Sequence, residues 1–389
     1  TKIFFNRPES SRFSFLDAMQ YWRKNPEDHL FLNTKKPYSN IYYQSGGSGI
    51  TAEKRLTTQM SSNFGKKLNL GFDFDYVYTR GFYKSLYNKQ VNYDLYGSYI
   101  GDKYKMHAFV ANNNFNNSEN GGIYDDIYIT NPNAEELRQF SGNSQDIPVR
   151  MQNTFNKMRG RHIYVTNRYD LGNDKYPHQV NDSTVVMRKK ENYVPLASVT
   201  LTTHYTDQRR RFTTSNDTLE NIFKPYYTEY GNKTNDPDSI KYPQAMNDYF
   251  AYYSFKNTLA LTMNEGFRSW TKFGLTAFIE YDMRKYSIPG SLPGLNTRSS
   301  ENVLTVGGVL SKEQSEFLKY KASAEKNLLD TDFRLEGEVT TRLNLWGKSM
   351  AVKAKAYLKN IKPGFYEENF SSKYRSWKFD FGDIRRLYM

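Results

Sequence analysis

The chain has 389 residues, a formal net charge of +13, a mean hydropathy of −0.80 and no cysteine. The lack of cysteine excludes disulfides and thiolate metal sites, and no apolar run approaches the roughly 18 residues of a membrane-spanning helix. A helical membrane protein is therefore excluded, but a transmembrane β-barrel is not, because its strands alternate lipid-facing and lumen-facing side chains.

Positive charge is spread along the chain among 41 acidic residues, and Arg209-Arg210-Arg211 is the one tight cluster. This cluster lies in a polar stretch, which indicates a solvated loop and not a nucleic-acid-binding face. We therefore expect no nucleic-acid partner. The net charge favours contact with anionic lipid head groups.

Residues 1–38 form an N-terminal segment whose place in the fold the pattern leaves open. Its first residues, TKIFF, show no signal-peptide pattern. Trp22 lies in this segment, which we expect either to line or to enter a barrel formed by residues 39–389.

From residue 39 onward, apolar and polar side chains alternate with a period of two. In residues 68–79, Leu and aromatic side chains on one face oppose Asp73 and Asp75 on the other. The same alternation recurs in residues 273–283, 333–345 and 350–360. Such runs exceed the ~5–6 residues of an ordinary strand and match the ~9–11 of a tilted membrane strand.

Short and long connections mostly alternate along the chain. Short links occur at residues 65–66, 101–102, 265–269, 313–315 and 347–348; long polar segments occupy residues 81–90, 112–157, 207–248, 285–301 and 361–375. This asymmetry is typical of outer-membrane barrels, which have short periplasmic turns and long extracellular loops. Two links depart from it: residues 330–331 are short where a loop is due, and residues 172–192 are long where a turn is due. We predict an antiparallel transmembrane β-barrel of about fourteen or more strands; the alternative is a large soluble β-sandwich or propeller.

The stretch MAVKAKAYLKN, residues 350–360, places apolar residues on one face and three lysines on the other. Lysine facing lipid at the midplane costs about 2–4 kcal/mol, so the charged faces are predicted to line the lumen. The candidate lumen-lining residues are Asp73, Asp75, Glu280, Asp282, Arg284, Arg334, Glu336, Glu338, Arg342, Lys353, Lys355 and Lys359. Two interpretations stay open: these charges bias which solutes pass, or they pair across strands and hold the register.

Several segments resemble the putative-porin family of Bacteroidota: ENVLTVGGVLSKEQ (residues 301–314), YLKNIKPGFYEENF (357–370), KLNLGFDFDYVYTRGFY (67–83), YGSYIGDKYKMHAFVANNN (96–114) and ENGGIYDDIYITNP (119–132). The resemblance covers essentially the whole chain in the same order. It implies a large outer-membrane β-barrel in a Gram-negative envelope. It also implies that the chain is an incomplete part of a longer protein, because the final DFGDIRRLYM lacks a terminal aromatic closing strand.

We expect a porin-like channel for passive diffusion of small hydrophilic solutes, in contact with outer-membrane lipid and lipopolysaccharide. The alternative is a structural barrel that docks outer-membrane proteins or lipoproteins through its long loops. No H-E-x-x-H or Gly-x-Ser-x-Gly motif is present, so we expect neither an enzyme nor a cofactor. The stretch NNNFNNSENGG (residues 112–122), followed by Asp125 and Asp126, offers oxygen ligands for calcium in an outer loop, but such loops are common and we predict no metal. Interfacial aromatic residues are expected near predicted strand ends at Trp270, Trp346 and Trp377.

Overall fold

The computed structural model describes residues 11–47, 51–138, 140–172, 175–181, 184–189, 195–214, 246–267, 271–290, 296–315, 317–345, 348–372 and 376–388. Fourteen strands form one antiparallel sheet in the order β1-β2-β3-β4-β5-β6-β9-β10-β11-β12-β13-β14-β15-β18. The all-β class and the strand number predicted from the sequence are thus confirmed. Among the described residues, no helix is both long enough and apolar enough to cross a membrane.

The strands of the main sheet are β1 (Tyr38–Gly46), β2 (Glu53–Phe64), β3 (Leu68–Arg80), β4 (Tyr87–Ile100), β5 (Tyr104–Ser118), β6 (Thr154–Leu171), β9 (Ala197–Thr214), β10 (Met246–Met263), β11 (Gly274–Pro289), β12 (Asn296–Lys312), β13 (Leu318–Asn327), β14 (Phe333–Leu345), β15 (Lys348–Ile361) and β18 (Ile384–Tyr388). The smaller elements are η1 (Ser14–Trp22), α1 (Ile127–Thr130), η2 (Glu135–Leu137), η3 (Ser144–Asp146), β7 (Lys175–Asn181), β8 (Thr184–Lys189), α3 (Phe365–Glu368), β16 (Asn369–Ser371) and β17 (Ser376–Lys378).

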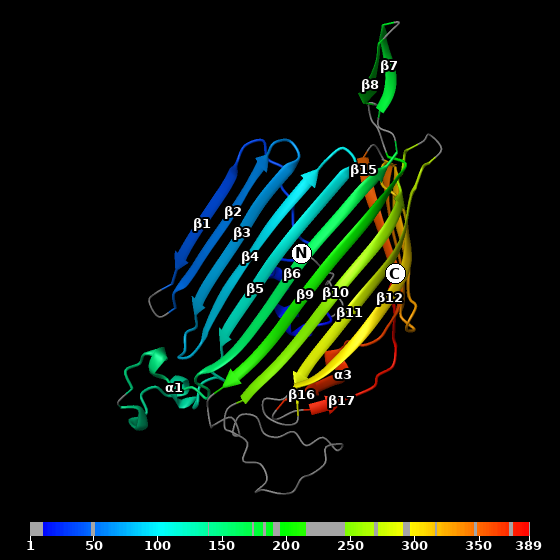
Figure 1. Ribbon diagram of the computed structural model, residues 1–389. Helices are drawn as coiled ribbons and strands as arrows, with labels where there is room; N and C mark the ends of the chain where they lie inside the picture. The colour runs from blue at the N-terminus through cyan, green and yellow to red at the C-terminus, as the bar shows by residue number, and fades with distance from the viewer. Residues whose placement is uncertain are drawn as a thin grey trace.

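The sheet curves around the N-terminal segment, which lies against its concave face (Figure 1). Within the described residues, the edge strands β1 and β18 are not paired with each other. The unexpectedly long link after β6 contains the β7–β8 hairpin, which projects from the short-turn end of the sheet (Figure 1). The short link predicted at residues 330–331 is a turn between β13 and β14.

The two faces of the sheet differ in chemistry. We call the face that contacts the N-terminal segment the inner face and the opposite one the outer face. Large apolar side chains are exposed on the outer face, including Leu70, Leu95, Val110, Ile163, Leu201, Leu259, Ile279, Leu335, Val352 and Leu358. A continuous exposed apolar surface of this kind needs lipid around it.

Two predicted loops are partly strand. The Asn-rich stretch begins inside β5, and Arg209-Arg210-Arg211 lies inside β9. The expectation of a solvated loop was therefore wrong for residues 112–118 and for residues 209–211. The reason is that the outer face of these strand ends changes from apolar to polar and basic, so the period-two apolar pattern stops before the ladder of hydrogen bonds does.

Two wall glycines lie directly opposite inner-face aromatic residues. Gly71 pairs with Tyr96 and Gly307 pairs with Phe278. A Cβ at either glycine would overlap the facing ring. An aromatic ring laid over a strand glycine covers the backbone that the missing side chain exposes, and so supports this register.

Candidate functional site

Apolar residues of the N-terminal segment anchor it to the inner face. Phe13 and Leu16 are completely buried. They belong to one cluster, which we call the inner cluster, with Phe115, Met158, Phe250, Tyr252, Tyr286 and Tyr366. Phe13 directly precedes η1, and the other members come from η1, β5, β6, β10, β11 and α3, so this cluster joins the segment to the middle of the wall.

A second segment reaches the same cluster from the loop side. Tyr366 of α3 is buried and donates hydrogen bonds to the carbonyl oxygens of Ala251 and Ser287. Its ring contacts that of Phe13, with centroids 5.4 Å apart. Burial raises the pKa of Tyr366 well above its usual range, so the hydroxyl remains a donor.

Buried charges hold the segment further along. The Nζ atom of Lys24 lies 3.7 Å from Oδ2 of Asp73 and 3.6 Å from Oδ2 of Asp94. The register places these two aspartates directly opposite each other on β3 and β4, an arrangement that is unfavourable for like charges. The side chain of Asp94 is 0% exposed. Lys24 is therefore placed between the two carboxylates as their counter-ion.

His29 completes this group, which we call the Lys24 cluster (Lys24, His29, Asp73 and Asp94). Its Nδ1 lies 3.8 Å from Oδ1 of Asp94. Burial, together with the nearby Lys24, lowers the pKa of His29 to about 4, so Lys24 is the cation of the cluster at neutral pH. Ligand atoms of His29, Asp73 and Asp94 lie within 4.8 Å of one another. That spacing suits a divalent cation, but the ammonium group already occupies the neighbourhood of both carboxylates.

Asparagine side chains of the wall bind the backbone of the segment. Asn113 accepts a hydrogen bond from the amide of Lys24 (2.7 Å) and donates one to its carbonyl (3.1 Å). Asn92 donates to the carbonyl of Trp22 (3.1 Å). The guanidinium group of Arg55 lies over the Trp22 ring and forms an ion pair with Asp75 (3.0 Å). The segment is thus bound through its side chains and its main chain.

A polar cavity of about 610 Å³ remains between this segment and the inner face of β9–β14. Four of the predicted lumen-lining residues border it: Glu280, Asp282, Arg284 and Arg334. Five further charged residues line the cavity: Arg12 and Glu27 of the N-terminal segment, and Lys256, Glu325 and Asp332 of the sheet and its turns. Arg284 and Asp282 form an ion pair of 2.6 Å, and Thr258 donates to Glu280 (2.9 Å).

The lysines of β15 lie on the same face as their partners on β14. Nζ of Lys353 is 2.7 Å from Oε1 of Glu338, and Nζ of Lys359 is 2.7 Å from Oε1 of Glu336. Lys355 is exposed beside them. Of the two open interpretations, this geometry favours cross-strand pairing for Lys353 and Lys359. Arg342 lies further along β14 and is exposed.

We expect Lys353→Glu to destabilise the barrel wall more than Lys355→Glu does. Both changes put a second carboxylate near Glu338, which the register places opposite Lys355. Only the first change also breaks an ion pair that the structure shows, because no ion pair of Lys355 is found among the described residues. Cross-strand charge pairs contribute roughly 0.2–1 kcal/mol, so the difference should be of that order. Urea unfolding of the folded barrel in detergent measures it; equal midpoints for the two variants would count against a structural role for the pair.

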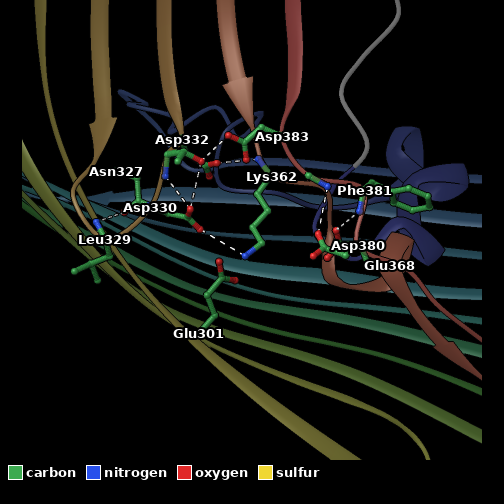
Figure 2. Close-up of polar contacts among 12 residues, drawn as sticks. Glu301, Asn327, Leu329, Asp330, Asp332, Lys362, Glu368, Asp380, Phe381 and Asp383 are labelled. Carbon is green, nitrogen blue, oxygen red and sulfur yellow. Dashed lines mark hydrogen bonds and ion pairs between the residues drawn. The ribbon is translucent and has the colours of Figure 1, made fainter.

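A polar network closes the loop-side ends of β13, β14, β15 and β18. Figure 2 shows Asp330, Asp332 and Lys362 converging there, with Asp383 beside them. Asp332 accepts a hydrogen bond from the backbone amide of Lys362 (2.8 Å). Hydrogen bonds from Thr331 and Asn360 lower the pKa of Asp383. These contacts explain why a short turn suffices at a position where a long loop is usual.

Of the three tryptophans predicted to lie at the membrane interface, the structure describes Trp377. Trp270 and Trp346 lie outside the described residues. Trp377 lies in β17, where its ring stacks on Phe370 with centroids 4.3 Å apart and its Nε1 donates to the carbonyl of Glu367 (3.0 Å). Phe370 in turn stacks on Phe250 of the inner face, which places Trp377 in the loop-side assembly and not at an end of the main sheet.

Sequence reasoning missed Lys24, His29, Asp94 and Tyr366. Their sequence neighbourhoods contain no spacing typical of a site. The one available signal is that Asp94 falls on the polar side of a period-two strand, in the same way as Asp73. That the two aspartates face each other depends on the register, which the pattern within either strand does not contain.

A family model described as putative porin matches residues 1–389. No curated protein is similar to this chain in sequence. A solved mutant of the ferric enterobactin receptor PfeA from Pseudomonas aeruginosa is similar in structure, with a TM-score of 0.52 and 12% identity over 86% of this chain and 45% of the receptor. PfeA in complex with BCV-L6 has a TM-score of 0.51 and 12% identity, over 86% of this chain and 46% of the receptor. The siderophore receptor PirA from Acinetobacter baumannii has a TM-score of 0.49 and 10% identity, over 87% of this chain and 45% of the receptor. The chain therefore spans less than half the length of each of these receptors.

Proposed function

Because the chain belongs to the putative-porin family and forms the wall of a barrel in the outer membrane, we propose that it conducts small hydrophilic solutes by passive diffusion. The barrel is of a transport type, and no catalytic step is needed for this role. The observation that supports the proposal most directly is the cavity between the N-terminal segment and β9–β14.

The chemistry of this cavity suits small polar solutes. Both signs of charge border it, and several of the charges are already paired within the wall. A mixed, hydrated lining of this kind replaces water contacts of a solute without binding it tightly, which is the condition for conduction. The N-terminal segment forms one side of the cavity and would limit the size of what passes.

We expect Glu280→Gln with Glu325→Gln to shift the selectivity of the pore toward anions. Both carboxylates border the cavity, so their removal makes its local field more positive. Reversal potentials across planar bilayers in a salt gradient report the change, which should shrink at high ionic strength through screening.

Glu53→Gln with Glu313→Gln is the matched control, because both side chains are exposed at connections between strands and away from the cavity. The control should leave the reversal potential unchanged. If purified, folded protein shows no conductance at all, or if both double variants behave alike, the solute does not pass through this cavity.

A docking role through the loop between β5 and β6 is a second candidate. This loop contains α1, η2 and η3, and Gln145 fastens it to the carbonyl oxygens of Gly81 and Phe82. Tyr124 and Ile129 are largely exposed on it, by 70% and 56%. We propose that these side chains form part of a contact for an outer-membrane protein or lipoprotein. Loss of a co-purifying partner in Tyr124→Ser with Ile129→Ser would support this; identical recovery of partners would contradict it.

A further inference from the structure

The outer face changes character along β6 and β9. Toward the short turns it is apolar, with Ile163 and Leu201 exposed. Toward the long loops it is basic, and we call Lys157, Arg159, Arg161, Arg209 and Arg211 the outer basic patch. Arginine facing lipid is costly at the midplane but costs only about 0–1 kcal/mol near the interface. The patch therefore lies where hydrocarbon gives way to head groups on the extracellular side.

Like charges face one another within this patch. The register pairs Lys157 with Arg211 and Arg159 with Arg209, and opposed like charges weaken a sheet. Asp207 is the one acid among the described outward-facing residues of these two strand ends. It binds Arg209 (2.7 Å) and Arg159 (3.4 Å). One carboxylate against five cations leaves an excess of positive charge that an anionic ligand would neutralise.

Neutral side chains orient two of these arginines. Nε of Arg161 donates to Oδ1 of Asn112 (3.1 Å), and Nε of Arg211 donates to Oδ1 of Asn247 (2.8 Å). Both arginines are exposed. An asparagine holds a guanidinium group in place without neutralising it. The outer edge of the guanidinium can then donate two hydrogen bonds to one phosphate group.

A groove of about 530 Å³ continues the basic surface across β10–β12. Its lining includes Tyr249, Tyr253, Lys285 and Arg298. The guanidinium group of Arg209 lies over the Tyr253 ring, 5.4 Å from its centroid, and connects the groove to the patch. From the groove toward the short turns the outer face is apolar again, with Phe255 and Met283 exposed.

We propose that the outer basic patch and this groove bind the phosphate groups of an outer-leaflet glycolipid, as carried by lipopolysaccharide. Its acyl chains would lie along the apolar part of the same strands, beginning at Ile163 and Phe255. This adjoining apolar surface favours a lipid over a free anion, because inorganic phosphate would gain nothing from it. The site lies on the outer face and is independent of conduction through the inner cavity.

The test compares Lys157→Gln, Arg161→Gln and Arg211→Gln, combined in one variant, with a control that removes three basic residues of the inner face: Lys319→Gln, Lys321→Gln and Lys355→Gln. Both variants leave the ion pairs of Asp207 in place. Binding of purified lipopolysaccharide to the full chain in detergent is measured with intact lipid, with enzymatically dephosphorylated lipid and with inorganic phosphate alone. Heat-modifiable migration verifies that each variant is folded.

We expect the patch variant to bind intact lipopolysaccharide about a hundredfold more weakly than wild type, because each basic residue near an anionic surface contributes roughly a fivefold factor. The control should bind as wild type does, and dephosphorylated lipid should bind both poorly. Equal affinity of the patch variant and wild type would overturn the proposal. So would saturation of the patch by inorganic phosphate at the concentration where the lipid binds, since that result would identify a free-anion site.

Discussion

Replacing Phe13 and Leu16 with alanine is expected to raise the single-channel conductance of the barrel several-fold. Both side chains are completely buried in the inner cluster. Truncations of this kind cost about 3–5 kcal/mol for Phe and about 2–5 kcal/mol for Leu. The part of the segment that these two side chains anchor should detach from the inner face and leave a wider passage. Planar-bilayer recordings of the double variant measure the effect.

A second measurement tests whether the N-terminal segment has detached in this double variant. Because the chain has no cysteine, Met19→Cys introduces a unique thiol at a position packed against the inner cluster. Its labelling should accelerate in the double variant. Tyr21→Ala is the control, since that side chain is 88% exposed. Rapid labelling with unchanged conductance would show that the segment does not obstruct solutes.

Lys24→Met is expected to destabilise the barrel by several kcal/mol. The change leaves Asp73 and Asp94 opposite each other and without their cation, and Asp94 has no exposed surface. Removing one partner of a buried ion pair typically costs about 3–5 kcal/mol. Because the Lys24 side chain retains 27% exposure, the loss should lie at the lower end of that range. Urea unfolding in detergent provides the measurement.

A second substitution separates lost charge from lost packing. Lys24→Met combined with Asp94→Asn removes one of the two opposed carboxylates and should recover a large part of the stability. The coupling between the two positions follows from the four variants of a double-mutant cycle. If the double variant is no more stable than Lys24→Met alone, Lys24 does not stabilise the barrel by neutralising the two aspartates.

The wall of the barrel was predictable because every second side chain of each strand faces lipid and must be apolar. In residues 68–79 and 350–360 this requirement produces an alternation with a period of two. The alternation predicts how long each strand is and which side chains share a face. The alternation ends where the membrane ends. For that reason the basic part of β9 was assigned to a loop, although its backbone continues to pair with β6 and β10 through Thr214.

The interior was not predictable in the same way. Phe13 and Leu16 belong to a short stretch without periodicity, and their partners lie on strands and a helix far along the chain. The pairing of Asp73 with Asp94 depends on the turn between β3 and β4. Contacts of this kind arise only from the assembled sheet, so no local pattern marks Lys24 as their counter-ion.

The inner cluster also sets an order of events during biogenesis. Phe13 is synthesised early, yet it contacts Tyr366 and shares the inner cluster with Phe250 and Tyr286, all of which leave the ribosome later. Contacts between distant parts of a chain form slowly because the intervening loop must first close. The N-terminal segment must therefore wait, with its aromatic rings uncovered, while the wall assembles beside it. Such uncovered surface favours aggregation, so the yield of folded barrel should fall as the time before the segment is covered grows.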